Sequence, residues 1–536
     1  MDAMKKLLAS LNLLLLGLCS IPQASYAQSA PDLDAACSAI SKFALPLTRI
    51  TRAEAIRVIG EHAISGTENG IGRGAPAPVQ VHRSLCRVAG VVERAINFEV
   101  WMPLANWNGR FQGLGLGAFW GKLPYGSMAE ALDKGYAVGG TDTGHQSEWD
   151  DATWTMPNGA FDEGVVGDWT HRGIHEMTIK SQAIVEKFYG RPAEHSYFTG
   201  CSSGGHQAMT QAQRYPADYD GILAGAPANY MTHLQAAQIS FGLATLVDPA
   251  ARLDKPIDKT PALHKAVLAA CDALDGVEDG LIENPAVCRF DPSELACTGT
   301  DSATCLTPPQ VQAVRRIYSD IRRSDGTKIF PGFPRGSELG WPQMAANYLG
   351  SNGQVAWAET LYRYLVFQDP KWNFATMNLE RDVAYADQHV GKLMNSMDPN
   401  LRPFRDRGGK LIQYHGWADW GITPYNSMDY FNSVVSTVAG STSDAAREDV
   451  QGFYRLFLMP GVSHCRGGTG PDTFDGLGAL EAWVERGEAP KRIEAAKLEE
   501  GKPVRTRPLC PYPQVARYSG NGSIDDAENF ACVAAE

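Results

Sequence analysis

Gly200-Cys201-Ser202-Ser203-Gly204 stands between a run of strand-forming residues (195–199) and a run with helical character (205–214). A chain that turns sharply from a strand into a helix strains the residue at the apex, and small neighbours let the backbone take that turn. The apex side chain, Ser202, is then held in the open above the free N–H groups of the helix N-terminus. This stretch therefore predicts a serine nucleophile at a strand–turn–helix elbow.

The pattern G-x-S-x-G at such a junction is typical of α/β-hydrolases. Further strands are expected at 88–102, 136–140, 221–225, 410–415 and 453–459, and a helix is expected over 173–189. After about residue 228 strand-like runs become rare, and aromatic residues and helical patches dominate up to about 398. We predict an α/β-hydrolase fold with a large inserted lid domain: hydrolase residues 28–227 and 399–536, lid 228–398. The first part, residues 28–80, reads as an arm with one short helix over 51–62.

Composition and charge exclude some partner classes. The chain has 536 residues, of which 44% are hydrophobic and 20% charged, so it can bury a large core. Its formal net charge of −12 argues against nucleic acid as a partner, because no strong basic field meets the phosphates. Nothing in the sequence indicates an oligomeric state.

The N-terminus has the pattern of an export signal. Lys5-Lys6 precedes an apolar run over residues 7–19, and Ser25-Tyr26-Ala27 supplies the small residues of a cleavage site, so residues 1–27 are predicted to be a signal peptide. A lipoprotein signal that uses Cys19 is the alternative, and the large Leu18 disfavours it. Since no other run is long enough to span a bilayer, we expect a secreted or periplasmic protein without membrane contact after cleavage.

Cysteine usage agrees with export. Ten of the eleven cysteines remain after the signal is removed, and an even number in an exported chain implies disulfides. Sequence cannot prove connectivity, but proximity along the chain favours the pairs Cys271–Cys288, Cys297–Cys305 and Cys510–Cys532.

A serine hydroxyl needs a base to take its proton, and the base needs a third group to orient it. In α/β-hydrolases these groups follow the serine in the order acid, then histidine. Asp419 lies in a loop after one late strand, and His464 lies in the loop after the next. Other histidines lack this placement, and His415, at a strand end, is expected to be a structural hydrogen-bonding residue.

The pairing of the four remaining cysteines is predicted from the residues next to two of them. If Ser202 and His464 touch, the adjacent Cys201 and Cys465 must also be close, and a bridge between them ties two loops 264 positions apart. Cys37–Cys86 then completes the set. A free-thiol nucleophile at Cys201 is the alternative, and the even cysteine count disfavours it.

A glycine-rich loop over residues 113–117 follows a predicted strand, where α/β-hydrolases place their second oxyanion donor. The N–H groups of Ser203 and Gly117 are therefore the candidate donors. The glycines are two positions apart, which does not fit a nucleotide-binding G-x-G-x-x-G motif. Ordinary turn glycines are the alternative interpretation.

Residues 271–281 form a dense acidic loop in which carboxylates alternate with glycines. Such a loop can surround a hard cation with oxygen ligands, although its spacing is not that of an EF-hand. A solvated acidic turn is the alternative, and the flanking Cys271–Cys288 pair favours structural Ca²⁺.

Cys201-Ser202, Asp419 and His464-Cys465 together resemble the CS-D-HC pattern of the tannase and feruloyl esterase family, which includes a terephthalate monoester hydrolase. The similarity extends over the mature chain, including the acidic loop and the ending at residues 506–513. It implies hydrolysis of esters of aromatic acids. It also implies calcium held by side chains and carbonyls of Asp272, Asp275, Val277, Asp279 and Leu281.

In the lid, residues 363–367 match a family segment. The resemblance implies that Arg363 meets a substrate carboxylate and Phe367 stacks on its ring, and the two share one helix face. An ordinary ion pair and core packing are the alternative. Trp420, next to Asp419, is a further candidate for contact with a substrate.

The expected activity is that of a serine esterase acting on a small aromatic ester, such as one of gallate or ferulate, through Ser202, His464 and Asp419. Terephthalate monoester hydrolysis is the second esterase interpretation. A non-catalytic, calcium-stabilised binding protein for phenolics is the alternative from another class.

Overall fold

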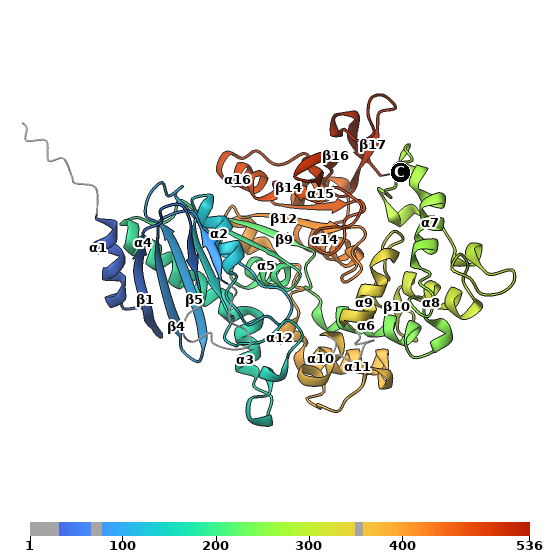
Figure 1. The fold of residues 1–536 in the computed structure, drawn as a ribbon, viewed down its shortest axis with the longest axis horizontal. Coiled ribbons are helices and arrows are strands. Elements are labelled where there is room, and N and C mark those ends of the chain that lie inside the picture. The colour runs from blue at the N-terminus through green and yellow to red at the C-terminus, as the bar shows by residue number, and fades with distance from the viewer. Residues whose placement is uncertain (1–31, 66–77, 349–356, 536) are drawn as a thin grey trace, which may run out of the picture. The chain divides into compact units, whose positions relative to one another are not determined.

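A nine-stranded sheet crosses the computed structural model, which describes residues 32–65, 78–348 and 357–535 (Figure 1). The predicted signal peptide lies outside these residues. The first four strands in the sheet pair antiparallel, and the rest pair in parallel. In spatial order the strands are β1 (Thr48–Ile56), β4 (Leu85–Val92), β5 (Ile96–Pro103), β7 (Ala137–Thr141), β6 (Arg110–Leu114), β8 (His195–Cys201), β9 (Gly221–Gly225), β12 (Lys410–Gly416) and β13 (Tyr454–Met459).

Helices cover both faces of the sheet. Successive strand side chains point to opposite faces, so Phe198 of β8 packs with one helix group and Tyr197 with the other. The first group comprises α4 (Gly173–Tyr189), α5 (Ser203–Arg214) and α14 (Pro424–Ala439). The second comprises α2 (Tyr125–Asp133) and α16 (Gly476–Arg486). This α/β fold confirms the predicted fold class, and the predicted strands and α4 are found within three residues of their expected ends.

The predicted helix over residues 51–62 is wrong, because most of this segment belongs to strands. β1 pairs antiparallel with β4, and β2 (His62–Ile64) pairs with β3 (Val79–Val81). β1 is rich in Thr and Ile, which favour the pleated surface. The ladder to β4 outweighed the local helical pattern on which the prediction was based.

The segment between β9 and β12 is mainly helical and lies at the opposite end of the molecule from β1 in Figure 1. Its buried core includes Trp341, Trp357 and Tyr362, and continues into Trp420 and Ile422 beyond β12. The lid boundaries at 228 and 398 stay a prediction. The elements are α6 (Met231–Thr245), α7 (Thr260–Cys271), α8 (Pro308–Tyr318), β10 (Ile321–Arg322), β11 (Lys328–Phe330), α9 (Trp341–Tyr348), α10 (Trp357–Leu361), α11 (Leu379–Ala386), α12 (Lys392–Met394) and α13 (Arg402–Asp406).

Five disulfides join the pairs that the sequence predicts. They are Cys37–Cys86, Cys201–Cys465, Cys271–Cys288, Cys297–Cys305 and Cys510–Cys532. The last of these connects the C-terminal hairpin of β17 (Gln514–Tyr518) and β18 (Phe530–Ala534) to the end of β16 (Lys502–Leu509). Five bridges are typical of proteins that fold in an oxidising compartment.

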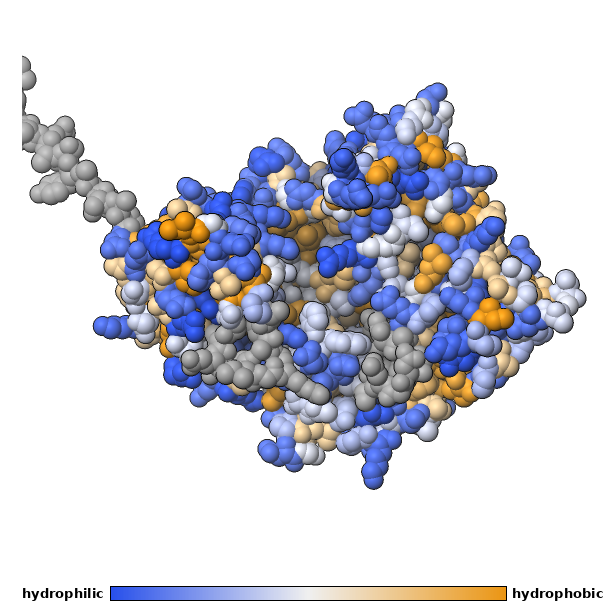
Figure 2. Space-filling view, in the orientation of Figure 1, coloured by the Kyte–Doolittle hydropathy of each residue, from blue (hydrophilic) through white to orange (hydrophobic). Residues whose placement is uncertain are grey.

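Hydrophilic residues cover most of the face seen in Figure 2, and hydrophobic residues lie singly or in small groups. None of the helices in the described residues has the length and apolar character needed to cross a membrane.

Candidate active site

Ser202 lies at the apex of the turn from β8 into α5. Its backbone has φ 63° and ψ −121°, a left-handed conformation that is strained for a residue with a side chain. The turn is held by the hydrogen bond from the Ser202 N–H to the Gly225 carbonyl, 3.0 Å long. A Cβ on Gly205 would lie 2.2 Å from that same carbonyl oxygen, and one on Gly200 would lie 2.5 Å from the Gly204 oxygen. Close backbone packing therefore requires glycine at positions 200 and 205.

The loop after β6 lies against the elbow. A Cβ on Gly115 would come within 2.8 Å of the Gly204 Cα, and the Leu116 N–H donates to Oε1 of Gln207 at 2.9 Å. A Cβ on Gly117 would meet nothing within 4 Å, so this residue faces open space. Ser203 is the first residue of α5, where N–H groups have no partner within the helix. This arrangement suits the two predicted donors, and their role stays a prediction.

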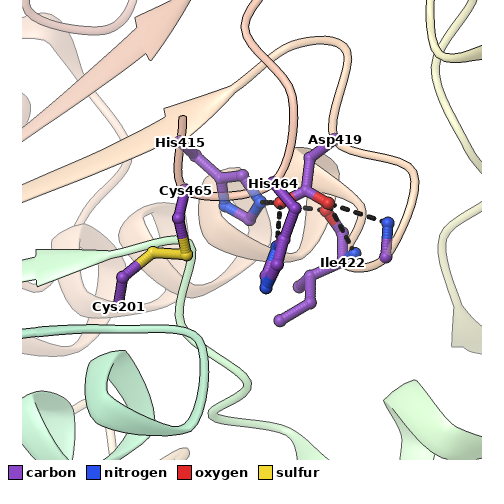
Figure 3. Close-up of a disulfide and its surroundings, with 7 residues drawn as sticks. Cys201, His415, Asp419, Ile422, His464 and Cys465 are labelled. Carbon is purple, nitrogen blue, oxygen red and sulfur yellow. Dashed lines mark hydrogen bonds and ion pairs between the residues drawn. A yellow bond between two sulfur atoms is a disulfide. The ribbon is translucent and has the colours of Figure 1, made fainter. Parts of the chain in front are cut away.

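The buried Asp419 and the half-buried His464 form a pair (Figure 3). Nδ1 of His464 donates to Oδ2 of Asp419 at 2.8 Å, and the other ring nitrogen points away from the carboxylate. Oδ1 of Asp419 accepts the backbone N–H groups of Gly421 (2.8 Å) and Ile422 (2.9 Å). Asp419 is fully buried, so these donors fix its orientation and stabilise its charge.

The pair shifts the pKa of both members. Burial alone would raise the pKa of Asp419, but the nearby His464 and the hydrogen bonds from His415 and His464 hold it well below its ordinary value. Burial alone would lower the pKa of His464, yet the charge of Asp419 and the hydrogen bond that it accepts raise this pKa above 6.5. Asp419 is therefore ionised and favours a protonated imidazole, as an acid that supports a catalytic base must.

The Cys201–Cys465 bridge brings the elbow and the histidine loop together. Its Cα atoms are 6.0 Å apart, and Ser202 and His464 are the direct chain neighbours of its two cysteines. Among the residues that the structure describes, neither the Ser202 hydroxyl nor Nε2 of His464 has a hydrogen-bond partner. Contact between the two stays a prediction, and catalytic hydrogen bonds often tighten only when a substrate is bound.

The lid candidates have partners within the protein. Nη2 of Arg363 donates to Glu359 at 2.8 Å, and its Nε donates to the Trp372 carbonyl at 2.9 Å. The ring of Phe367 packs against Tyr362, Trp372 and Tyr385, with centroids 5.0–5.9 Å away. These contacts are those of the alternative interpretation, an ion pair and core packing, and contact with a substrate stays a prediction.

Trp420 lies beside the candidate base. Its ring centroid is 6.2 Å from that of His464, at an interplanar angle of 60°. The side chain is buried and packs in the core of the helical segment between β9 and β12. A substrate contact by Trp420 stays a prediction as well.

His415 has a closer relation to Asp419 than its position in the sequence suggested. Its Nε2 lies 3.2 Å from Oδ2 of Asp419, so the carboxylate has two histidine partners. The spacing H-x-x-x-D, with the histidine on the strand end and the acid in the following loop, is the signal that could have indicated this contact.

The acidic loop over residues 271–281 has internal contacts that bear on its capacity to hold a cation. Oxygens of Asp272 and Asp275 accept backbone N–H groups within the loop, and Asp279 also pairs with the buried Arg507. Burial and the nearby charges of Asp279 and Asp272 together raise the pKa of Asp275 to about 6. These neighbouring carboxylates are hard oxygen donors of the kind that Ca²⁺ prefers.

The aspartates are not drawn tightly together. Within the described residues, three potential metal-ligating side chains come within 4.8 Å of one another only at Cys297, Asp301 and Cys305, and these cysteines form a disulfide. The donor set of the acidic loop thus fits a hard cation in its chemistry, and calcium binding stays a proposal.

Comparison with known proteins identifies the family. A family model described as "Tannase and feruloyl esterase" matches residues 79–533. The chain belongs to the tannase and feruloyl esterase family. It is a carboxylic ester hydrolase of this type.

Two relatives and one solved structure show how far the similarity extends. The chain is 34% identical to the mono(2-hydroxyethyl) terephthalate hydrolase of Piscinibacter sakaiensis, over 84% of this chain and 85% of that protein. It is 33% identical to a probable feruloyl esterase B-1 of Aspergillus oryzae, over 85% of each. The crystal structure of feruloyl esterase B from Aspergillus oryzae superposes with a TM-score of 0.82 and 29% identity, covering 94% of this chain and 100% of that one.

Proposed function

We propose that this family member hydrolyses esters of aromatic, phenolic acids such as gallate or ferulate, with Ser202 as its nucleophile. The observation that carries the proposal is the Cys201–Cys465 disulfide, because it fixes the strained Ser202 beside the loop that bears the His464–Asp419 pair. A serine, a base and an oriented acid are the three parts that acyl transfer requires.

In the proposed mechanism, Nε2 of His464 takes the Ser202 proton while Oγ bonds to the ester carbonyl carbon. The carbonyl oxygen becomes an oxyanion, which the N–H groups of Ser203 and Gly117 stabilise. Collapse of this intermediate breaks the bond to the alkoxy oxygen, and His464 gives the proton to the departing alcohol. Water then repeats the sequence on the acyl-enzyme, releasing the acid and the free serine. Throughout, Asp419 holds the imidazole tautomer and stabilises its cation.

The substrate class is supported by the relatives. Their names refer to esters of ferulic and terephthalic acid, both aromatic acids. Aromatic residues of the predicted lid also share a core with Trp420, the direct neighbour of Asp419. Terephthalate monoester hydrolysis is the second candidate, which the 34% identity to that hydrolase favours.

A substrate panel tests the proposal. Catalytic efficiency is measured on four aromatic esters, methyl gallate, methyl ferulate, chlorogenate and mono(2-hydroxyethyl) terephthalate, and on methyl and ethyl esters of aliphatic acids. We expect the highest kcat/KM on a phenolic ester and loss of all activities in Ser202→Ala. A preference for the terephthalate monoester would support the second candidate, and a preference for aliphatic esters over all four would contradict both.

We propose further that the protein is exported, to the periplasm or the medium. The apolar N-terminal signal and the five disulfides support this proposal. N-terminal sequencing of the mature protein from its native host tests it. We expect the mature chain to begin at Gln28, and a chain that retains Met1 would contradict the proposal.

We also propose a structural Ca²⁺ held by the side chains of Asp272, Asp275 and Asp279 and the carbonyls of Val277 and Leu281. The cation would offset the repulsion among the carboxylates and support the loop next to the Cys271–Cys288 bridge. Thermal unfolding with EGTA and with excess CaCl₂ tests this proposal. Calcium should raise Tm in the unaltered chain and not in Asp275→Asn, and an equal Tm in both solutions would contradict it.

A further inference from the structure

A chain of buried hydrogen bonds leads from the sheet to Asp419. Tyr454 bonds to Oε1 of Gln413, whose Nε2 donates to Oγ of Ser427 at 2.6 Å. The same hydroxyl bonds to Nδ1 of His415 at 2.7 Å, and Nε2 of His415 lies 3.2 Å from Oδ2 of Asp419. All five side chains are fully buried.

With a neutral His415 ring, the chemistry of the partners fixes the direction of every bond. Nε2 of His415 also lies 2.9 Å from the carbonyl oxygen of Ile422, which can only accept, so Nε2 carries the proton. In a neutral ring, Nδ1 then accepts, and the Ser427 hydroxyl must donate to it. Ser427 in turn accepts from the amide of Gln413, whose carbonyl accepts from Tyr454. Each member donates toward Asp419, and the single Nε2–H of His415 is shared between Oδ2 of Asp419 and the Ile422 carbonyl.

We propose that His415 is a positioning residue for the esterase reaction, held as the neutral Nε2–H tautomer by Ser427 and donating to Oδ2 of Asp419. This inference rests on the proposed function. His415 touches no reacting atom, and it acts through the carboxylate that orients His464. Backbone N–H groups hold Oδ1, and ring nitrogens of His415 and His464 both reach Oδ2 (Figure 3).

Two consequences follow for catalysis. The bond from His415 restricts rotation of the carboxylate, so that Oδ2 stays 2.8 Å from Nδ1 of His464. It also takes up part of the negative charge on Oδ2, which moderates the attraction of Asp419 for the imidazole proton. Hydrogen bonds to buried charged groups are among the strongest that side chains make, so loss of this one is expected to be measurable in kcat.

The first test compares His415→Leu with His415→Gln. Leucine removes the donor, whereas the glutamine amide can place an N–H near the position of Nε2. We expect His415→Leu to lower kcat by about ten- to a hundredfold with KM changed less than about threefold. His415→Gln should recover most of this loss, although both variants break the bond to Ser427 and should unfold at similar temperatures. An equal kcat in both variants would overturn the proposal.

Ser427→Ala leaves His415 in place and removes the donor to its Nδ1. Its kcat is expected to fall between those of the unaltered chain and His415→Leu, because the donor to Asp419 remains but its tautomer is no longer fixed. A kcat below that of His415→Leu would overturn the direction of the chain.

An NMR titration of the His464 ring separates this inference from the proposed function, because it needs no turnover. Removal of His415 leaves more charge on Oδ2, so the pKa of His464 should be higher in His415→Leu than in the unaltered chain. An unchanged or lower pKa would overturn the proposal. An unaltered chain that hydrolyses no ester would instead contradict the proposed function, and the titration would then decide the role of His415.

Discussion

Asp419→Asn should inactivate the enzyme while leaving its fold intact. The carboxylate accepts four hydrogen bonds: two from backbone N–H groups on Oδ1 and one from each histidine on Oδ2. An asparagine can accept at one oxygen only. If that oxygen stays with the backbone groups, the NH₂ group faces Nδ1 of His464, which must then accept. The imidazole proton moves to Nε2, where it prevents removal of the Ser202 proton.

The expected loss follows from this change of tautomer. In serine hydrolases with the same arrangement, the wrong tautomer lowers kcat by about 10⁴-fold, equivalent to about 5 kcal/mol of transition-state stabilisation. The assay is the absorbance change on hydrolysis of methyl ferulate, with Tm measured in parallel. Asp472→Asn is a matched control, since Asp472 accepts the Gly467 N–H in the histidine loop and does not contact His464. A well-folded Asp419→Asn enzyme within tenfold of the unaltered kcat would refute the reasoning.

Two other predictions concern the bridge and the base. Replacing Cys201 and Cys465 by alanine opens a closed loop with a sequence separation of 264 and should cost up to about 5 kcal/mol of unfolding free energy as well as most of kcat. Replacing Cys297 and Cys305, separated by 8, should lower the unfolding free energy by about half as much and leave kcat unchanged. Equal effects on kcat in the two double variants would contradict the role of the Cys201–Cys465 bridge in positioning Ser202 and His464. Because the pKa of His464 is raised above 6.5 and the base must be neutral, kcat/KM should fall with decreasing pH around a midpoint above that value. The midpoint should move to lower pH in Asp419→Ala. A midpoint below 6.5 in the unaltered enzyme would contradict a His464 pKa raised by Asp419.

The sequence was most informative where local pattern and global fold agree. The elbow was predictable because a strand, three glycines around a small apex and a helix follow each other within twenty residues. Asp419 and His464 were predictable because each follows a buried strand, and parallel strands deliver their following loops to one edge of the sheet. The cysteines next to Ser202 and His464 then implied the bridge.

Other features depend on contacts between distant residues, which one sequence does not contain. β1 resembled a helix locally, and only its ladder to β4 makes it a strand. Arg363 and Phe367 were expected to share one helix face, but Phe367 follows the end of the helix, and their partners Glu359 and Trp372 are set by the folded segment between β9 and β12. His415 needed the loop after β12 to fold back over the strand end before its contact with Asp419 existed.

The most direct test of the central claim is the site of covalent labelling by a serine-directed aromatic phosphonate, located by mass spectrometry of the intact, oxidised protein. We expect one adduct, on Ser202, that is absent from Ser202→Ala and forms far more slowly in His464→Ala. An adduct on a different residue in an active enzyme, or labelling of Ser202 at an unchanged rate without His464, would contradict it.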